Sequence, residues 1–378
     1  MMTRIFSLFI FLFLVHIAQA STPWLKRPLR YVCADSVITW GYDGKDFRRF
    51  ALVADSTATA YPMTLTRKAW NERKAIFEKW NVQVAERNLV GGSGDPLTES
   101  QGLAAVKWVD QAANLFQMQG DATYADYIER ALYNAILHTA HDTLLPRGSI
   151  DRKAAASLLL SAPGLIYATQ ANTDLYVNLY TNCTSRIKWG DGSFSVDQIT
   201  DMPMTGSVKL RFTQLGKGKR IALHLRMPDW AGLRPSPHYA YVGGEPQQPT
   251  IYVNGHELDP LEVDDKGYVT IERLWRNLDE VYIDFPLQAH YVKPLATSAS
   301  ERLAPIYGKA YLQWGPLVYA VKASASDYFV PSQPALPDNA ISPSGYPVLW
   351  GKYFHGKDAP QDAEAFSETF RVMPFGDQ

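Results

Sequence analysis

The sequence has few cysteines, no excess of either charge, and no long apolar run after its first twenty residues. Its 378 residues include two cysteines, Cys33 and Cys183. That number excludes a disulfide scaffold, and two isolated thiols without a nearby histidine do not indicate a structural zinc site. Lys and Arg number 37 against 38 Asp and Glu. Without a basic block or an acidic tail, we expect a folded protein that does not bind nucleic acid.

The N-terminus has the pattern of a secretory signal peptide. A short basic start, Met1–Arg4, precedes an apolar core at residues 5–17 and the small-x-small sequence Ala18-Gln19-Ala20. The apolar core is too short to span a membrane, and no later run is long and apolar enough to do so. We therefore expect residues 1–20 to be removed and the protein to be secreted or periplasmic. In such a compartment Cys33 and Cys183 either pair or remain separate buried thiols.

Aromatic side chains make up 12% of the sequence, with 10 Trp and 21 Tyr. Aromatic residues are frequent in β-strands, so one interpretation is a β-sheet core. The other is a set of exposed rings that stack on sugars. Solvent exposure of four tryptophans, Trp189, Trp230, Trp275 and Trp314, distinguishes the two.

Residues 21–98 form a segment of mixed pattern. Strands are expected at residues 31–40 and 49–54, an amphipathic helix at 65–80 and a short strand at 82–85. The glycine-rich stretch at 89–96 lacks a following Gly-Lys-Ser/Thr, so it is interpreted as an ordinary loop.

Residues 99–168 have helical periodicity. Apolar residues recur at three- and four-residue steps from Glu99 to Phe116, and Gly120-Asp121 ends that helix. A second helix is expected at 122–140, forming an antiparallel hairpin with the first. A third is expected at 151–160, capped near Ser149 or Asp151.

Residues 169–322 consist of short alternating runs separated by Gly, Pro and Asn turns, which predicts antiparallel β-sandwich structure. His224 falls within one such strand and is interpreted as a packed or exposed strand histidine. Residues 323–378 are rich in Pro, Ser and Gly and are expected to wrap the surface or lead out of the domain. The fold class is therefore α+β, with a helical block before the sandwich.

Six motifs in order resemble glycoside hydrolase family 127 (GH127), the β-L-arabinofuranosidase-like proteins. Their sequences are YADYIERALYN at 124–134, DLYVNLY at 174–180, LRMPDWA at 225–231, VNG at 253–255, GYVTIERLW at 267–275 and GPLVY at 315–319. The resemblance covers roughly residues 99–323. It implies an (α/α)6 toroid followed by β-sandwich domains, so residues 99–168 would be a partial toroid.

The resemblance also implies a retaining glycosidase with a cysteine nucleophile and a bound zinc. Its Glu-x-Cys motif aligns with Glu99-Ser100-Gln101, and its Cys-Cys pair aligns with Ile150-Asp151. Thiolates are therefore missing from all three positions, and glutamine and isoleucine cannot replace them as ligand or nucleophile. We expect no zinc cofactor.

Glu99 and Asp151 are the carboxylates at the matching positions, and we take them as candidate catalytic residues. Gln101, Asp126 and Glu129 are candidate substrate-binding residues. The alternative interpretation makes Glu99 a helix-start residue favoured by the helix dipole, Asp151 a cap, and Asp126 and Glu129 helix contacts.

Residues 21–168 are too few for six helical hairpins of about 40 residues each. A partial toroid exposes apolar helix faces, which leaves homo-oligomerisation open. Two hypotheses follow. The first is an exported GH127-like hydrolase acting on L-arabinofuranoside-type or related glycosidic bonds. The second is a non-catalytic carbohydrate-binding or accessory protein derived from such an enzyme.

Overall fold

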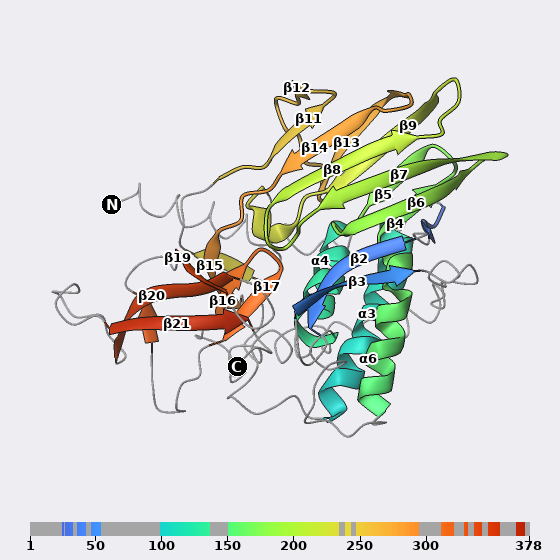
Figure 1. Ribbon diagram of the computed structural model, residues 1–378. Helices are drawn as coiled ribbons and strands as arrows, with labels where there is room; N and C mark the ends of the chain where they lie inside the picture. The colour runs from blue at the N-terminus through green and yellow to red at the C-terminus, as the bar shows by residue number, and fades with distance from the viewer. Residues whose placement is uncertain are drawn as a thin grey trace, which may run out of the picture.

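The computed structural model describes 13 stretches of the chain, and three β-sheets and a layer of helices account for most of them (Figure 1). The described residues are 25, 27–32, 36–42, 47–53, 99–136, 150–233, 239–242, 247–294, 311–320, 329–331, 336–341, 347–355 and 368–374, with side chains omitted in part of these ranges. The expected signal peptide, the helix at 65–80, the strand at 82–85 and the loop at 89–96 lie outside them.

The helical layer contains α3 (Glu99–Gln119), α4 (Ala122–Arg130) and α6 (Ile150–Ser161). Gly120 separates α3 from α4 with a φ of +70°, a conformation that glycine adopts without strain. Asp121 then caps α4, since its side chain accepts a hydrogen bond of 2.9 Å from the Thr123 amide. α4 continues as a π-helical turn, η2 (Ala131–Ile136), and α6 continues as a 3-10 turn, η3 (Ala162–Leu165). The expected helix starts at Glu99 and Ala122 are therefore confirmed, and the third helix begins at Ile150, one residue before the expected start.

A five-stranded sheet lies directly against these helices. Its order is β1-β4-β5-β9-β13, with β1 at Arg30–Val32, β4 at Tyr167–Gln170, β5 at Asp174–Val177, β9 at Lys219–Arg226 and β13 at Tyr268–Trp275. β5 and β9 pair in parallel, so the expectation of a purely antiparallel arrangement is wrong here. The chain leaves this sheet after β5, builds three strands of the next sheet, and returns as β9, and a parallel pair requires such a crossover.

The second sheet has eight strands and includes the N-terminal segment. Its order is β12-β11-β14-β8-β7-β6-β2-β3. The bounds are β12 His256–Glu257, β11 Thr250–Val253, β14 Glu280–Asp284, β8 Ser207–Thr213, β7 Gly192–Thr200, β6 Asn182–Trp189, β2 Ser36–Tyr42 and β3 Phe47–Val53. β3 confirms the strand expected at residues 49–54, whereas the single strand expected at residues 31–40 is divided between β1 and β2, which belong to different sheets. β6 and β7 were not predicted, although burial alternates along β6 as in any sheet with one covered face.

The five-stranded sheet and this eight-stranded sheet pack face to face. The rings of Phe212 on β8 and Trp275 on β13 stack with centroids 4.6 Å apart. Leu210 on one sheet and Leu223 on the other are fully buried in the same apolar cluster. Each such side chain stabilises the fold by about 1.5–3 kcal/mol, so this shared core is a major source of stability.

A third sheet contains the C-terminal strands. Its order is β10-β15-β16-β17-β21-β20-β18, and β19 also pairs with β20. The bounds are β10 Tyr239–Val242, β15 Ala289–Pro294, β16 Tyr311–Trp314, β17 Leu317–Ala320, β18 Phe329–Pro331, β19 Leu336–Ile341, β20 Pro347–His355 and β21 Glu368–Pro374. Residues 323–378 were expected to wrap the surface or lead away, but their described parts form four strands, and β21 pairs with β17. Figure 1 shows this sheet at the lower left, beside the helices.

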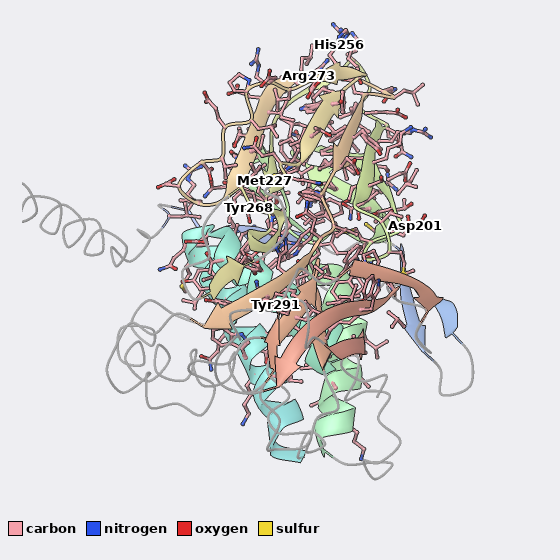
Figure 2. The ribbon with its side chains drawn as sticks, turned by 90° about the vertical axis from the view of Figure 1, so that its left-hand side faces the viewer. Asp201, Met227, His256, Tyr268, Arg273 and Tyr291 are labelled. Atoms are coloured by element: carbon pink, nitrogen blue, oxygen red, sulfur yellow. The ribbon has the colours of Figure 1, made fainter. Side chains whose placement is uncertain are left out.

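The helical layer covers the face of the five-stranded sheet that is turned away from the shared core. Phe116 on α3 contacts Tyr31 on β1 and Tyr176 on β5, with ring centroids 5.4 and 6.2 Å apart. The Leu29 amide donates to the Gln117 carbonyl at 2.8 Å, which attaches the end of α3 to the segment before β1. In Figure 2, Tyr268 lies where this sheet meets the helices, whereas Arg273 and His256 lie toward the far end of the sheets.

Candidate functional site

The first helical turns that carry Glu99, Gln101 and Asp151 lie at one end of the helical layer. α3 and α6 pack against each other, and Figure 1 shows them side by side. The carbonyls of Gln117 and Met118 in the last turn of α3 accept from Leu29 and Leu25, and α6 ends at η3, next to β1 and β4. Both helices therefore end at the five-stranded sheet, and both begin away from it. The side chains of Glu99, Gln101 and Asp151 lie outside the described part of the structure.

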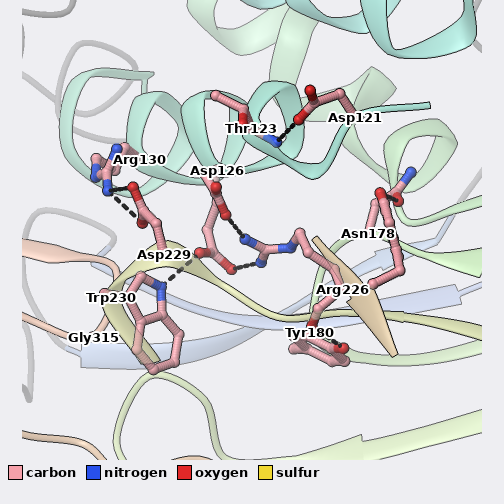
Figure 3. A network of polar contacts seen from close by, with 12 residues as sticks. Asp121, Thr123, Asp126, Arg130, Asn178, Tyr180, Arg226, Asp229, Trp230 and Gly315 are labelled. Carbon is pink, nitrogen blue, oxygen red and sulfur yellow. Dashed lines mark hydrogen bonds and ion pairs between the residues drawn. The ribbon is translucent and has the colours of Figure 1, made fainter. Parts of the chain in front are cut away.

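Asp126 and Glu129 lie on the face of α4 that meets the five-stranded sheet. Arg226, at the end of β9, donates from Nη1 to Asp126 Oδ1 at 2.6 Å and from Nη2 to Glu129 Oε1. The other Glu129 oxygen accepts from Trp230 Nε1 at 3.0 Å. Figure 3 shows Arg226 pointing toward Asp126. All these side chains are at most 3% exposed.

This buried arrangement assigns the two carboxylates to the contact between helix and sheet. Desolvation alone would lower the pKa of the Arg226 guanidinium, but the charges of Glu129 and Asp126 outweigh it and raise that pKa. Arg226 thus remains charged between two acceptors. Asp126 and Glu129, at positions i and i+3, contact it from one side of the helix. These contacts agree with the alternative given from the sequence, in which both residues make helix contacts.

A second buried pair joins the end of α4 to the turn after β9. Arg130 Nη2 lies 2.5 Å from both carboxylate oxygens of Asp229, in the 3-10 turn η4 (Asp229–Ala231). It also donates to the hydroxyl of Tyr241 on β10. Asn134 in η2 donates to the Pro316 carbonyl at 2.9 Å and accepts from the Val318 amide at 2.8 Å. The helix therefore holds the third sheet as well as the five-stranded one. Arg130 and Asn134 belong to the motif at residues 124–134, but the sequence alone did not assign a role to either residue.

His224 belongs to a polar cluster on the same sheet face as Arg226. Its Nε2 lies 2.8 Å from Asp174 Oδ1, its Nδ1 lies 2.8 Å from Thr270 Oγ1, and its ring stacks on Tyr176 at 4.1 Å. Strand register places Tyr176, His224 and Thr270 directly opposite one another on β5, β9 and β13. His224 is thus a packed strand histidine with two polar partners.

The side chains that align with the zinc site of the resembled family lie outside the described part of the structure, and the thiol that the structure does describe is not suited to zinc. Cys183 on β6 is buried, and its sulfur lies 3.7 Å from the Tyr167 hydroxyl and 3.7 Å from the Gln198 amide nitrogen. Burial raises the pKa of its thiol to about 11, although hydrogen bonds from Tyr167, Ser185 and Gln198 oppose the shift. A thiol of this kind is a poor zinc ligand. Across the described residues no group of three or more His, Cys, Asp and Glu side chains is placed to hold a metal.

The tryptophans singled out from the sequence belong mostly to the core. Trp275 is fully buried, and Trp230 and Trp189 are 3% and 7% exposed. Trp314 is partly buried against the small apolar cluster of the third sheet. The interpretation of these rings as strand core is confirmed for the first three, so they are not sugar-stacking platforms.

Residues 174–287 match the profile of the GH127 middle domain of β-L-arabinofuranosidases. The chain is GH127-like. The matched range begins at β5 and ends after β14, so it contains most strands of the two face-to-face sheets but leaves out β1, β2, β3 and β4. No curated protein sequence matches the chain.

Solved structures of GH127 enzymes share this fold. The chain is 22% identical to a GH127 β-arabinofuranosidase, with a TM-score of 0.55, and covers 46% of that protein with 73% of its own length. Against a GH127 β-L-arabinofuranosidase from Geobacillus stearothermophilus T6 it is 22% identical, with a TM-score of 0.55 and 47% coverage of that chain. A glycoside hydrolase gives 18% identity, the same TM-score and 49% coverage. The chain thus spans about half the length of the solved proteins that it resembles.

Among the described helices, none is long and apolar enough to cross a membrane.

Proposed function

We propose that this chain is an exported GH127-like protein that binds L-arabinofuranoside-type or related plant glycans without the thiol-based zinc chemistry of the resembled family. One observation carries the proposal. The GH127-like β region is present, whereas Gln101, Ile150 and Asp151 occupy the positions where the family has thiols.

The donor chemistry at these positions supports binding rather than thiol-dependent hydrolysis. Isoleucine has no electron pair to offer to a metal or to an anomeric carbon. A glutamine amide is a weak, neutral ligand compared with a thiolate. Cys183, the thiol that the structure does describe, is buried in the core between the two sheets. We therefore derive no step through zinc or through a cysteine nucleophile.

Binding and turnover are tested on the same preparation of residues 21–378. Isothermal titration with soluble arabinan, arabinoxylan and arabinogalactan measures binding, and a panel of aryl furanosides and pyranosides measures hydrolysis. We expect measurable binding to at least one arabinose-containing glycan and no turnover above that of a heat-inactivated sample. A folded protein that binds none of these glycans contradicts the proposal.

Hydrolysis by a carboxylate pair is the second candidate function. The arrangement of α3 and α6 favours this second function. The two neighbouring helices begin at the same end of the helical layer, so the backbones of Glu99 and Asp151 lie at that end. A retaining glycosidase needs its two carboxylates about 5 Å apart, one as nucleophile and one as acid and base. Turnover that Glu99→Gln and Asp151→Asn each abolish, with binding retained, would establish this function in place of the first.

Export and assembly are tested separately. Residues 1–20 support export, and N-terminal sequencing of protein recovered outside the cytoplasm should begin near Ser21. Leu160 on α6 is 67% exposed, which motivates a measurement of oligomeric state by sedimentation velocity. A monomer would remove homo-oligomerisation from the proposal and leave glycan binding intact.

A further inference from the structure

Two tyrosines lie next to each other on the outer face of the eight-stranded sheet that contains β7, β8, β11 and β14. Strand register aligns Ile199, Lys209, Tyr282 and Tyr252 in one row across these strands. We call this row the tyrosine face. The neighbouring residues along each strand, such as Val208, Val281 and Ile283, point the other way and are fully buried. The row therefore belongs to the side of the sheet opposite the shared core.

The rings of the tyrosine face are accessible and held in position. Tyr282 is 40% exposed and Ile199 is 48% exposed. The Tyr282 hydroxyl donates to Ser207 Oγ at 3.0 Å, and Ser207 donates to Asp284 Oδ1 at 3.3 Å. The Tyr252 and Tyr282 rings lie with centroids 6.3 Å apart at 51°. A ring that is already fixed loses little conformational entropy when a ligand covers it.

Three charged side chains beside the tyrosine face, Lys209, Arg211 and Glu280, are paired with one another. Lys209 Nζ and Arg211 Nε each lie 2.8 Å from a different oxygen of Glu280. The hydrogen bonds from Lys209 and Arg211 lower the pKa of the Glu280 carboxyl, which keeps it ionised. The next carboxylate along this face, Asp197, accepts from Thr184 at 3.0 Å. The face thus offers many hydrogen-bonding atoms, and Lys209 and Arg211 on it are both paired with the Glu280 carboxylate.

We propose that the tyrosine face is a binding site for an uncharged, hydroxyl-rich glycan chain. Tyrosine rings present an apolar surface that covers the C–H side of a sugar ring, with a polar edge that stays hydrated. Lys209, Arg211 and Glu280 offer donors and acceptors for sugar hydroxyls at the same level, and their mutual pairing suits a neutral ligand better than a charged one. The inference rests on the proposed function and names the surface that carries it.

The test compares variants of the full mature chain by isothermal titration and by affinity gel electrophoresis with soluble arabinan and arabinoxylan. Tyr282→Ala and Tyr252→Ala should each weaken Kd about tenfold, as expected for one lost stacking contact. Tyr282→Phe keeps the ring and should stay within about threefold. Leu160→Ala, an exposed position on α6 outside this face, is the matched control and should bind like the wild type. Circular dichroism verifies that each variant is folded.

Each remaining outcome overturns the inference in a distinguishable way. If the wild type binds a neutral glycan and Tyr252→Ala/Tyr282→Ala binds it equally well, the site lies elsewhere and the proposed function stands. If the wild type binds no glycan, the proposed function fails and this inference fails with it. Binding of polygalacturonate alone would mean that the face selects charge. Loss of self-association with unchanged glycan binding would make it a contact between copies of the chain.

Discussion

The guanidinium of Arg226 on β9 lies 2.6 Å from the carboxylate of Asp126 on α4, and neither side chain is more than 2% exposed. Glu129 accepts from the same guanidinium. One arginine therefore compensates two buried carboxylates at the boundary between the helices and the sheet. Removing one partner of such a group leaves uncompensated buried charge, which is costly.

Arg226→Leu should lower the free energy of unfolding by about 3–5 kcal/mol because Asp126 and Glu129 lose their counter-charge. Urea denaturation followed by circular dichroism measures the loss. Arg220→Gln is the control, because Arg220 pairs with Glu272 on the surface, where both side chains are more than 60% exposed. That change should cost less than about 1 kcal/mol. Equal costs for the two variants would contradict the compensating role of Arg226.

The contribution of Asp174 to stability should disappear in acid. Burial tends to raise the pKa of its carboxyl, but hydrogen bonds from His224 and Thr173 and the charge of His224 outweigh this effect and lower it. The folded pKa is therefore below the unfolded value of about 3.9. The stabilisation is complete above the unfolded pKa and is lost as pH falls through the folded one.

Asp174→Asn should therefore be less stable than the wild type at pH 7, and the difference should shrink as pH falls below about 4. The measurement is the urea midpoint at a series of pH values. Asp265→Asn, at an exposed position, is the comparison variant and should follow the wild type throughout. A difference between Asp174→Asn and wild type that stays constant down to pH 3 would contradict the lowered pKa.

The thiol of Cys183 should be unreactive in the folded protein. Burial raises its pKa to about 11, so at pH 8 only about one molecule in a thousand carries the thiolate that attacks reagents. In a Cys33→Ser background, dithionitrobenzoate should label less than about a tenth of the protein natively, and one equivalent after unfolding in guanidinium. Rapid labelling of the native protein would contradict this prediction, because it would show that the reagent reaches Cys183 in the core around β6.

Gly206, just before β8, lies in close backbone contact with Phe285, just after β14. The Phe285 amide donates to the Gly206 carbonyl at 3.0 Å, and a Cβ at position 206 would lie 1.8 Å from the Phe285 carbonyl oxygen. Gly206→Ala should lower the free energy of unfolding by at least about 3 kcal/mol, because backbone cannot move aside as a side chain can.

Gly192→Ala provides the matched control for Gly206→Ala. A Cβ at position 192 has the Lys219 ammonium nitrogen as its nearest neighbour, at 3.9 Å, so stability should change by no more than about 0.5 kcal/mol. Thermal unfolding of both variants makes the comparison. A mild effect at Gly206 would mean that β8 and β14 can separate without loss of the fold.

Several elements could be predicted because their signals are local. The helix at Glu99–Gln119 follows from apolar spacing, and its end follows from Gly120-Asp121, where a positive φ and a capping carboxylate stop it. The strands at residues 207–213, 268–275 and 280–284 alternate in the sequence as they do in burial. β6 and β7 were missed because their buried positions include Cys183, Ser185 and Ser195 alongside apolar residues, which weakens the alternation.

The sequence predicted some residues of the candidate site but not the contacts between them. A motif marked Asp126 and Glu129, but nothing local indicates that Arg226, about a hundred residues later, lies between them. The two tyrosines of the tyrosine face are thirty residues apart, and only the pairing of β11 with β14 makes them neighbours. Glu99, Gln101 and Asp151 remain predictions from the resemblance.

The sequence by itself determined that a helical block precedes a region of strands, that the thiols are missing and that the chain resembles GH127, because these depend on residue identity and short-range spacing. Only the tertiary structure decided that β5 and β9 run parallel, that Trp275 is core, and that Tyr282 is exposed. The physical reason is that alternation in a strand assigns residues to two faces but does not say which face meets another layer. That choice depends on contacts between residues far apart in the chain.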